Sequence, residues 1–203
     1  MIKAELEFQK IYDTFRPRIL AYITRLIGTH EAEDLTQEVF IRVNQGLKDF
    51  RGTSKLSTWI YRIATNAALD RLRSPSFHKM TQETFSIDLE GREEDKFIQF
   101  QGRVSPLDQQ LVQKEMSRCI RNVIKKLPED YRTVIVLSEL EELKNHEIAK
   151  VLQVSLDTVK IRLHRARASL KKELENHCNF YRDERNVLAC DLKSAIKQFK
   201  EPD

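Results

Sequence analysis

The chain has 203 residues, of which 40% are hydrophobic and 33% charged, a composition that suits one or two small packed domains of a soluble protein. The formal net charge is only +4, so any strongly basic surface must be local. No segment approaches the apolar length of a membrane span, and the N-terminal sequence MIKAELEFQK does not resemble a signal peptide. We therefore expect a cytoplasmic protein without membrane insertion, whose three cysteines are free thiols.

The chain contains only five glycines and five prolines, and its apolar residues recur with a period of 3.6 over long stretches. This pattern predicts an all-α fold. The composition changes along the chain indicate two small helical domains joined by a flexible linker, the second with a helix-turn-helix.

The first block, from about Glu5 to Arg73, reads as three helices. The first ends near Gly28, the second covers 32–47, and a loop at 50–54 precedes the third at 56–72. Their expected core consists of Phe8, Ile11, Phe15, Ile19, Tyr22, Ile23, Leu26, Leu35, Val39, Phe40, Val43, Leu47, Leu56, Ile60, Ile63 and Ala67.

The third helix carries aromatic, basic and amide side chains off its core stripe. Trp59 and Tyr61 stand beside Arg62 and Asn66. Exposed aromatics next to such groups can stack on and hydrogen-bond unpaired bases, and Asn66 can read a base edge. The alternative is that the two aromatics cap the helical core.

The second helix has a polar outer surface, formed by Asp34, Gln37, Glu38, Arg42 and Asn44. Such a surface is either solvated or a docking face for a basic protein partner.

The character of the chain changes from Ser74 to about Val104. This stretch has prolines near both ends and no sustained periodicity, which is typical of an interdomain linker. The alternative, which its four phenylalanines leave open, is a segment folded against one of the two domains. A helix is expected at 107–126, and Pro128 followed by acidic residues marks the start of the next one.

The segment His146–Lys172 has the pattern of a helix-turn-helix: a short helix, a turn at Gln153 and Val154, and a longer basic helix. We expect Asn145 to cap the first helix and Ser155 the second. Gln153 stands where such turns often have glycine, so the turn is expected to be strained or differently shaped.

The second of these helices combines a buried stripe with basic flanks. The expected stripe is Val159, Leu163, Ala166 and Leu170. Its basic side chains supply sequence-independent affinity for phosphates, whereas Thr158 and Arg162 are better placed for base edges. The alternative is a solvated basic helix packed on a bundle.

An acidic run (Glu139, Glu141, Glu142 and Glu147) precedes the basic helix. It is either a solvated acidic surface or a separate face for a separate partner.

The sequence contains no complete motif of the enzyme classes considered. His146 and Glu147 are followed by Lys150 where a zinc-protease motif needs histidine, and the glycine spacing near Gly52 is not that of a P-loop. A metal or redox site at His177, Cys178 and Cys190 is less favoured than an incidental grouping. We expect no catalytic residue, no cofactor and no metal.

Three segments together resemble one family, the extracytoplasmic-function (ECF) sigma factors of bacterial RNA polymerase. They are DLTQEVFIRV at 34–43, FRGTSKLSTWIYRIATNAALDRLR at 50–73 and LPEDYRTVIVLSELEELKNHEIAKVLQVSLDTVKIRLHRARASLKK at 127–172. The resemblance implies an alternative sigma factor that binds core polymerase, directs it to specific promoters and promotes DNA melting. The alternative function is a helix-turn-helix repressor or activator that is not a sigma subunit.

The resemblance implies a division into region two at 1–74, a linker at 75–106, region four at 107–175 and a tail of unknown role at 176–203. It implies core polymerase contacts, at the β′ clamp helices, by Asp34, Leu35, Gln37, Glu38 and Phe40. It implies minus-ten contacts by Arg51, Ser54, Lys55, Trp59, Tyr61, Arg62 and Asn66. It implies minus-thirty-five contacts by Ser155, Thr158, Lys160, Arg162, Arg165 and Arg167. The implied partners are core RNA polymerase (β′ clamp helices and β flap), promoter DNA and an anti-sigma factor.

Overall fold

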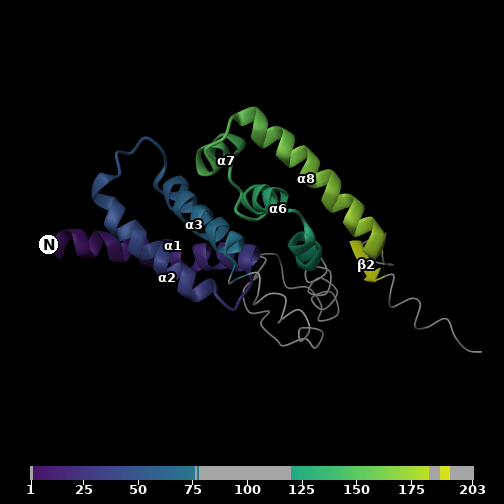
Figure 1. Ribbon diagram of the computed structural model, residues 1–203, viewed down its shortest axis with the longest axis horizontal. Coiled ribbons are helices and arrows are strands. Elements are labelled where there is room, and N and C mark those ends of the chain that lie inside the picture. The colour runs from purple at the N-terminus through teal and green to yellow at the C-terminus, as the bar shows by residue number, and fades with distance from the viewer. Residues whose placement is uncertain (1, 76, 78–119, 183–187, 193–203) are drawn as a thin grey trace, which may run out of the picture. The chain divides into compact units, whose positions relative to one another are not determined.

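The computed structural model describes residues 2–75, 77, 120–182 and 188–192, and in this part of the chain the predicted, predominantly α-helical fold is confirmed (Figure 1). Most of the expected helix at 107–126, and almost all of the expected linker, lie outside the described residues; 120–126 is helical. The elements are α1 (Ile2–Ile27), α2 (Ala32–Gly46), η1 (Leu47–Asp49), α3 (Leu56–Arg73), α6 (Glu129–Ile135), η2 (Val136–Leu140), α7 (Asn145–Leu152), α8 (Leu156–His177), β1 (Cys178–Arg182) and β2 (Leu188–Leu192).

The described chain forms two compact units. The first contains α1, α2, α3 and residues 133–160, and therefore includes η2, α7 and the start of α8. Of the described residues, the second contains 120–132, 161–182 and 188–192. The domain bounds implied by the family resemblance remain a prediction.

Helices α1, α2 and α3 pack against one another around an apolar core. Most of the predicted core positions are buried; Phe8, Phe15, Leu47, Leu56 and Ile63 are half-buried. Each fully buried Leu or Ile side chain stabilises the fold by about 1.5–3 kcal/mol, so this core dominates the stability of the first unit. Gly28 ends α1 with φ +92°, a backbone conformation that glycine adopts without strain.

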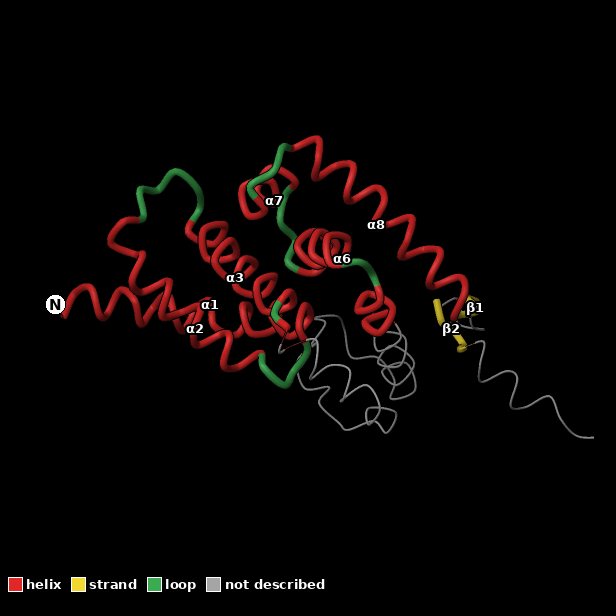
Figure 2. The backbone as a smooth tube through the Cα atoms, viewed as in Figure 1, coloured by secondary structure: helices red, strands yellow, loops and turns green. Residues whose placement is uncertain are grey.

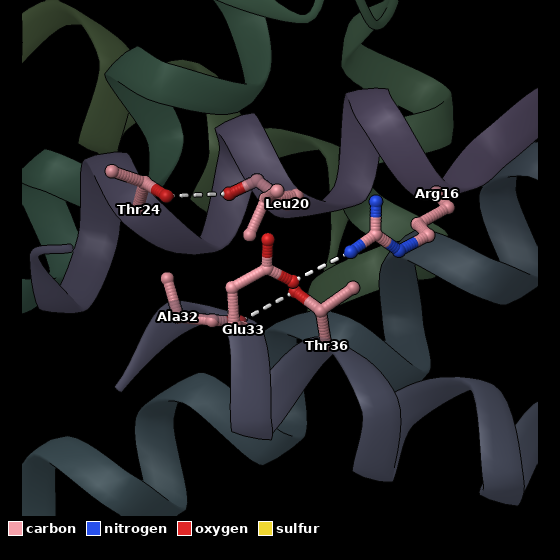
Figure 3. Close-up of polar contacts among 6 residues, drawn as sticks. All are labelled: Arg16, Leu20, Thr24, Ala32, Glu33 and Thr36. Atoms are coloured by element: carbon pink, nitrogen blue, oxygen red, sulfur yellow. Dashed lines mark hydrogen bonds and ion pairs between the residues drawn. The ribbon is translucent and has the colours of Figure 1, made fainter. Parts of the chain in front are cut away.

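Polar contacts at the α1–α2 junction lie at the edge of this core (Figure 3). Arg16 of α1 pairs with Glu33 in the first turn of α2 at 2.7 Å, and both side chains are substantially exposed. The Thr36 hydroxyl donates to the carbonyl of Ala32 at 2.6 Å, which satisfies a buried polar group inside its own helix. Because exposed pairs contribute about 0–1 kcal/mol, this ion pair orients the two helices more than it stabilises them.

A chain of two hydroxyl groups crosses the centre of the core. The Thr65 hydroxyl donates to the carbonyl of Tyr61 at 2.6 Å, and the Tyr22 hydroxyl lies 2.8 Å from the Thr65 oxygen. Threonine has a single hydroxyl proton, so Tyr22 must be the donor to Thr65. Burial raises the pKa of Tyr22 well above its ordinary value, which keeps this hydroxyl protonated.

Two short strands, which were not predicted, follow α8 in the tail. Strands β1 and β2 pair antiparallel, with Cys178 opposite Leu192 and Phe180 opposite Cys190. The β1 sequence CNFYR contains two aromatic residues, which favour strands. Cys178 is buried and, as expected, is not in a disulfide.

The hydroxyl chain gives a stability prediction. Thr65→Val should lower the free energy of unfolding by about 1–3 kcal/mol, because it leaves the buried Tyr22 hydroxyl without an acceptor. Tyr22→Phe should cost only about 1 kcal/mol, because Thr65 keeps its bond to the carbonyl of Tyr61. Urea unfolding of both variants measures the difference. A larger loss for Tyr22→Phe would contradict this assignment of the donor.

Candidate nucleic-acid interface

Trp59, the only tryptophan of the chain, is wedged at the start of α3 against two earlier residues. Its ring centroid lies 5.1 Å from that of Phe50 in a tilted arrangement. On the other side, a Cβ atom added to Gly46 would lie 3.0 Å from the indole, closer than ordinary packing allows. A glycine at the end of α2 therefore makes room for this half-buried ring.

A pocket of about 470 Å³ opens beside this tryptophan, within the size range of ligand sites. Four of the predicted minus-ten residues, Arg51, Ser54, Trp59 and Arg62, line it. Two residues of the α7 region that the sequence did not assign to this site, Lys150 and Gln153, also line it. The full lining is Asp49, Phe50, Arg51, Thr53, Ser54, Thr58, Trp59, Arg62, Lys150 and Gln153. A partly buried aromatic ring beside two arginines is suited to holding an unstacked base.

Tyr61 is placed differently from the expected exposed aromatic. Its residue surface is only 4% exposed, its ring packs edge-on against Tyr22 at 5.2 Å, and its hydroxyl donates to Glu141. Burial, with the Glu141 charge as the next cause, raises the pKa of Tyr61. The alternative in which an aromatic caps the core therefore describes Tyr61 in this structure. Asn66, by contrast, is exposed.

The acidic run before the basic helix does not form a solvated surface throughout. The Glu141 carboxylate, 5% exposed, accepts hydrogen bonds from Arg25 of α1 and Tyr61 of α3. Burial raises the pKa of Glu141, and its two partners oppose that shift. Both contacts join residues about 80 or more positions apart in the chain, and no local sequence pattern could have revealed them.

Glu147 makes two contacts at the start of α7, one with a backbone N–H group and one with a lysine. Its carboxylate accepts the Lys144 backbone N–H at 3.0 Å, which corrects the expected cap: the helix begins after Lys144, and Asn145 is its first residue. The same carboxylate pairs with the Lys55 ammonium at 2.8 Å. Because Lys55 is 69% exposed, the pair is worth about 0–1 kcal/mol. These bonds lower the pKa of Glu147, with Lys55 the largest cause.

Helices α7 and α8 are separated by the three residues 153–155, drawn as a loop in Figure 2, at the position of the predicted helix-turn-helix turn. Gln153 takes the left-handed conformation with φ 55°, so the expected strain at this position is present. Ser155 caps α8 as predicted, since its hydroxyl accepts the Thr158 N–H at 3.1 Å.

Helix α8 separates a buried stripe from a basic surface. Val159, Leu163 and Ala166 are buried, whereas Leu170 is half-buried. The predicted DNA-facing residues include the exposed Ser155, Lys160, Arg165 and Arg167, and the half-buried Thr158 and Arg162. Within the second unit Arg162 pairs with Asp130 at 3.2 Å, a neighbour that the sequence pattern did not reveal.

The predicted polymerase-docking residues of α2 lie on two sides of the helix. Asp34 and Gln37 are exposed, and Glu38 is half-buried and pairs with Arg42 along the helix. Leu35 and Phe40 are each 2% exposed, and the Phe40 ring meets that of Tyr12 edge-on. In this structure Leu35 and Phe40 therefore hold α2 in place, while the polar residues form its surface.

The lowered pKa of Glu147 predicts a pH-dependent contribution to stability. A group with a depressed pKa in the folded state stabilises the fold above its unfolded pKa, about 4.3 for glutamate, and loses that contribution as the pH falls through the folded value. Glu147→Gln keeps an acceptor for the Lys144 N–H but removes the charge. At low salt the variant should be less stable than the wild type near pH 7, by up to about 1 kcal/mol, and equally stable at the acidic end. Thermal unfolding across this range checks it; a difference that grows toward acid would refute the sign.

Comparison with known proteins matches both halves of the chain to one family. Residues 11–77 match the family model of sigma-70 region 2, and residues 117–170 match that of sigma-70 region 4. Among described residues no helix combines the length and apolar character needed to cross a membrane.

The curated relatives carry the same assignment over most of their length. The chain is 37% identical to the ECF RNA polymerase sigma factor SigW of Bacillus subtilis, covering 83% of this chain and 89% of that protein. It is 33% identical to the RNA polymerase sigma-H factor of Pseudomonas aeruginosa, covering 79% and 82%. Among solved structures, the sigma factor RpoE of Bartonella quintana in complex with the anti-sigma factor NepR has the same fold, with a TM-score of 0.61 and 20% identity over 83% of this chain and 97% of that one. The chain belongs to the ECF sigma factors of bacterial RNA polymerase.

Proposed function

We propose that this alternative sigma factor reads its promoters at two separate points, with a different kind of contact at each. The pocket beside Trp59 would hold an unstacked base of the minus-ten element, and the exposed face of α8 would bind the minus-thirty-five duplex. The observation that carries this proposal is the pocket itself, since Arg51, Trp59 and Arg62 converge there from a loop and a helix. A repressor that binds only duplex DNA has no need of such a pocket.

The chemistry of the two surfaces supports this division. An unpaired base offers a π-face to an aromatic ring. Flipping the base from the duplex costs a few kcal/mol, which binding in the pocket must offset. The surface of α8 has instead a row of exposed cations for phosphates, with Ser155 and Thr158 at the end of the helix that enters a groove.

The polar surface of α2 is the proposed docking site for the β′ clamp helices of core polymerase. Asp34 and Gln37 are exposed there, and Glu38 is paired with Arg42 along the same helix. In this proposal the buried side chains of Leu35 and Phe40 hold α2 in position. The contact of the second half of the chain with the β flap rests on the family resemblance.

An anti-sigma factor is the further partner that we propose. The solved structures with this fold include RpoE with the anti-sigma factor NepR and CnrH with the cytosolic domain of CnrY, the latter with a TM-score of 0.57. The residue bounds 1–74 for region two and 107–175 for region four belong to the same proposal. The matched family models, at 11–77 and 117–170, support them.

Run-off transcription tests the function directly. Core polymerase with this protein should yield promoter-specific transcripts from a library of genomic fragments, whereas core polymerase alone should not. If no fragment gives such a transcript, the proposed function is wrong.

Side-chain variants test the division between the two points. Trp59→Ala or Asn66→Ala should impair open-complex formation and leave affinity for minus-thirty-five duplex DNA unchanged. Arg162→Ala should weaken duplex binding by about 1–3 kcal/mol if it contacts a base edge. Permanganate footprinting measures the first and fluorescence anisotropy the second, with Glu139→Ala, an exposed acidic residue outside both surfaces, as control. Equal losses in both assays for Trp59→Ala would reject the division.

A further inference from the structure

We propose that Gly46 is a positioning residue for promoter opening. In this proposal Gly46 makes no contact with DNA, but its missing side chain fixes where the Trp59 indole lies, and the indole in turn shapes the pocket at the minus-ten surface. The inference rests on the proposed function, because it concerns the ring assigned to an unstacked base. The residues involved lie between 46 and 62, within the first compact unit.

The backbone of Gly46 does not require glycine. Its φ of −85° and ψ of −6° are those of the third residue of a type I turn, a conformation that most residues adopt. Gly28 and Gly52, by contrast, have φ values of +92° and +68°, and a Cβ atom at either would have open space around it. Gly46 is also the last residue of α2, and alanine is a better helix former than glycine. Glycine at this position therefore needs another reason.

The space beside Gly46 supplies that reason. A Cβ atom built on its backbone would lie 3.0 Å from Cζ2 of Trp59 and 3.5 Å from Cη2, both in the benzene half of the indole. Carbon atoms in optimal contact are about 3.5–4.0 Å apart, so the first of these contacts is too short. The indole therefore packs against the backbone of Gly46 at a distance that leaves no room for a methyl group.

Phe50 gives the indole a second support. Its ring centroid lies 5.1 Å from that of Trp59, at an interplanar angle of 39°. Phe50 directly follows η1, and its backbone N–H donates to the carbonyl of Leu47 at 3.3 Å, so both supports belong to one short turn after α2. The Trp59 N–H donates to the carbonyl of Lys55 at 3.1 Å, which fixes the backbone of the ring in the first turn of α3. The position of the indole is thus set from both ends of the loop.

The ring that Gly46 positions forms part of the wall of the pocket. Phe50, Trp59 and Arg62 line the pocket, whereas Gly46 does not. A base stacks well only when its plane meets an aromatic plane at the right place. A methyl group at residue 46 would displace the indole by a fraction of an ångström. Because a misplacement of about 1 Å can cost about a hundredfold in rate, we expect a loss of about tenfold from this smaller displacement.

Fluorescence of the free protein tests the packing without DNA. Trp59 is the only tryptophan of the chain, so the emission reports on this ring alone. Gly46→Ala should shift the emission maximum to longer wavelength and raise acrylamide quenching, because the ring is pushed away from the end of α2. The matched control is Gln45→Ala, a change of the exposed neighbouring residue, which should alter neither. Wild-type fluorescence in Gly46→Ala overturns the proposal.

The holoenzyme, formed from core polymerase and the full chain, gives the functional readout. On a promoter fragment that yields run-off transcripts with the wild type, Gly46→Ala should slow open-complex formation about tenfold and leave the affinity of the closed complex unchanged. Gln45→Ala should match the wild type in both. A wild-type rate of opening in Gly46→Ala, or an equal loss of closed-complex affinity and opening rate, contradicts a positioning role.

A compensating substitution separates displacement of the ring from a general loss of folding. Trp59→Phe removes the indole carbons that the new Cβ would meet. Gly46→Ala should lower the urea midpoint of the wild type, but it should keep or raise the midpoint of Trp59→Phe, because only the helix preference for alanine then remains. If Gly46→Ala alone fails to fold, the double variant should still fold. An equal loss in both backgrounds shows that alanine acts elsewhere, and refutes the inference.

Run-off transcription with the wild type separates the two possible failures. If the wild type directs promoter-specific transcripts but Gly46→Ala opens the promoter at the same rate, Gly46 has no positioning role and the proposed function stands. If no transcript appears from any fragment, the proposed function fails, and the fluorescence and unfolding measurements still decide whether Gly46 positions Trp59.

Discussion

A buried carboxylate that must remain paired is the constraint on which the first compact unit depends. Glu141 is almost completely removed from water, and burial alone disfavours its charged form. Arg25 and Tyr61 supply the donors that compensate, and they come from two different helices of the first block. Loss of either partner leaves a polar group buried without compensation. Breaking one of these two hydrogen bonds alone is therefore costly. The three elements therefore hold together or separate as a whole.

The surfaces that face outward depend on apolar packing beneath them. Val159, Leu163 and Ala166 fix the rotation of α8, and this sets which side the arginines occupy. Leu35 and Phe40 do the same for the polar surface of α2. Polar residues such as Ser155 and Glu147 then decide where each helix begins. The predicted DNA-facing residues of α8 are thus placed by apolar side chains buried on another side of the same helix.

Sequence patterns predicted these helices well, because a 3.6-residue apolar period over several turns leaves few alternatives. The Ser155 cap, the strained Gln153 turn and the buried stripe of α8 are confirmed. What depends on contacts far along the chain was not decided: the sequence left open whether Tyr61 is exposed or caps the core, and its burial comes from Tyr22 and Glu141. The two strands of the tail were not predicted for a local reason, because five-residue strands leave too little pattern to identify. The roles of the site residues stay predictions.

The shared carboxylate has a consequence for exchanging halves between related sigma factors. A hybrid that joins the first half of this chain to the second half of a relative keeps Arg25 and Tyr61, but it takes whatever residue that relative carries in place of Glu141. Where that residue is not acidic, the hybrid has a partly buried guanidinium and a buried hydroxyl without their acceptor. Compatibility of the halves is then decided at one position outside the predicted DNA-contacting residues, and grafting α8 alone, which keeps Glu141 in place, avoids the problem.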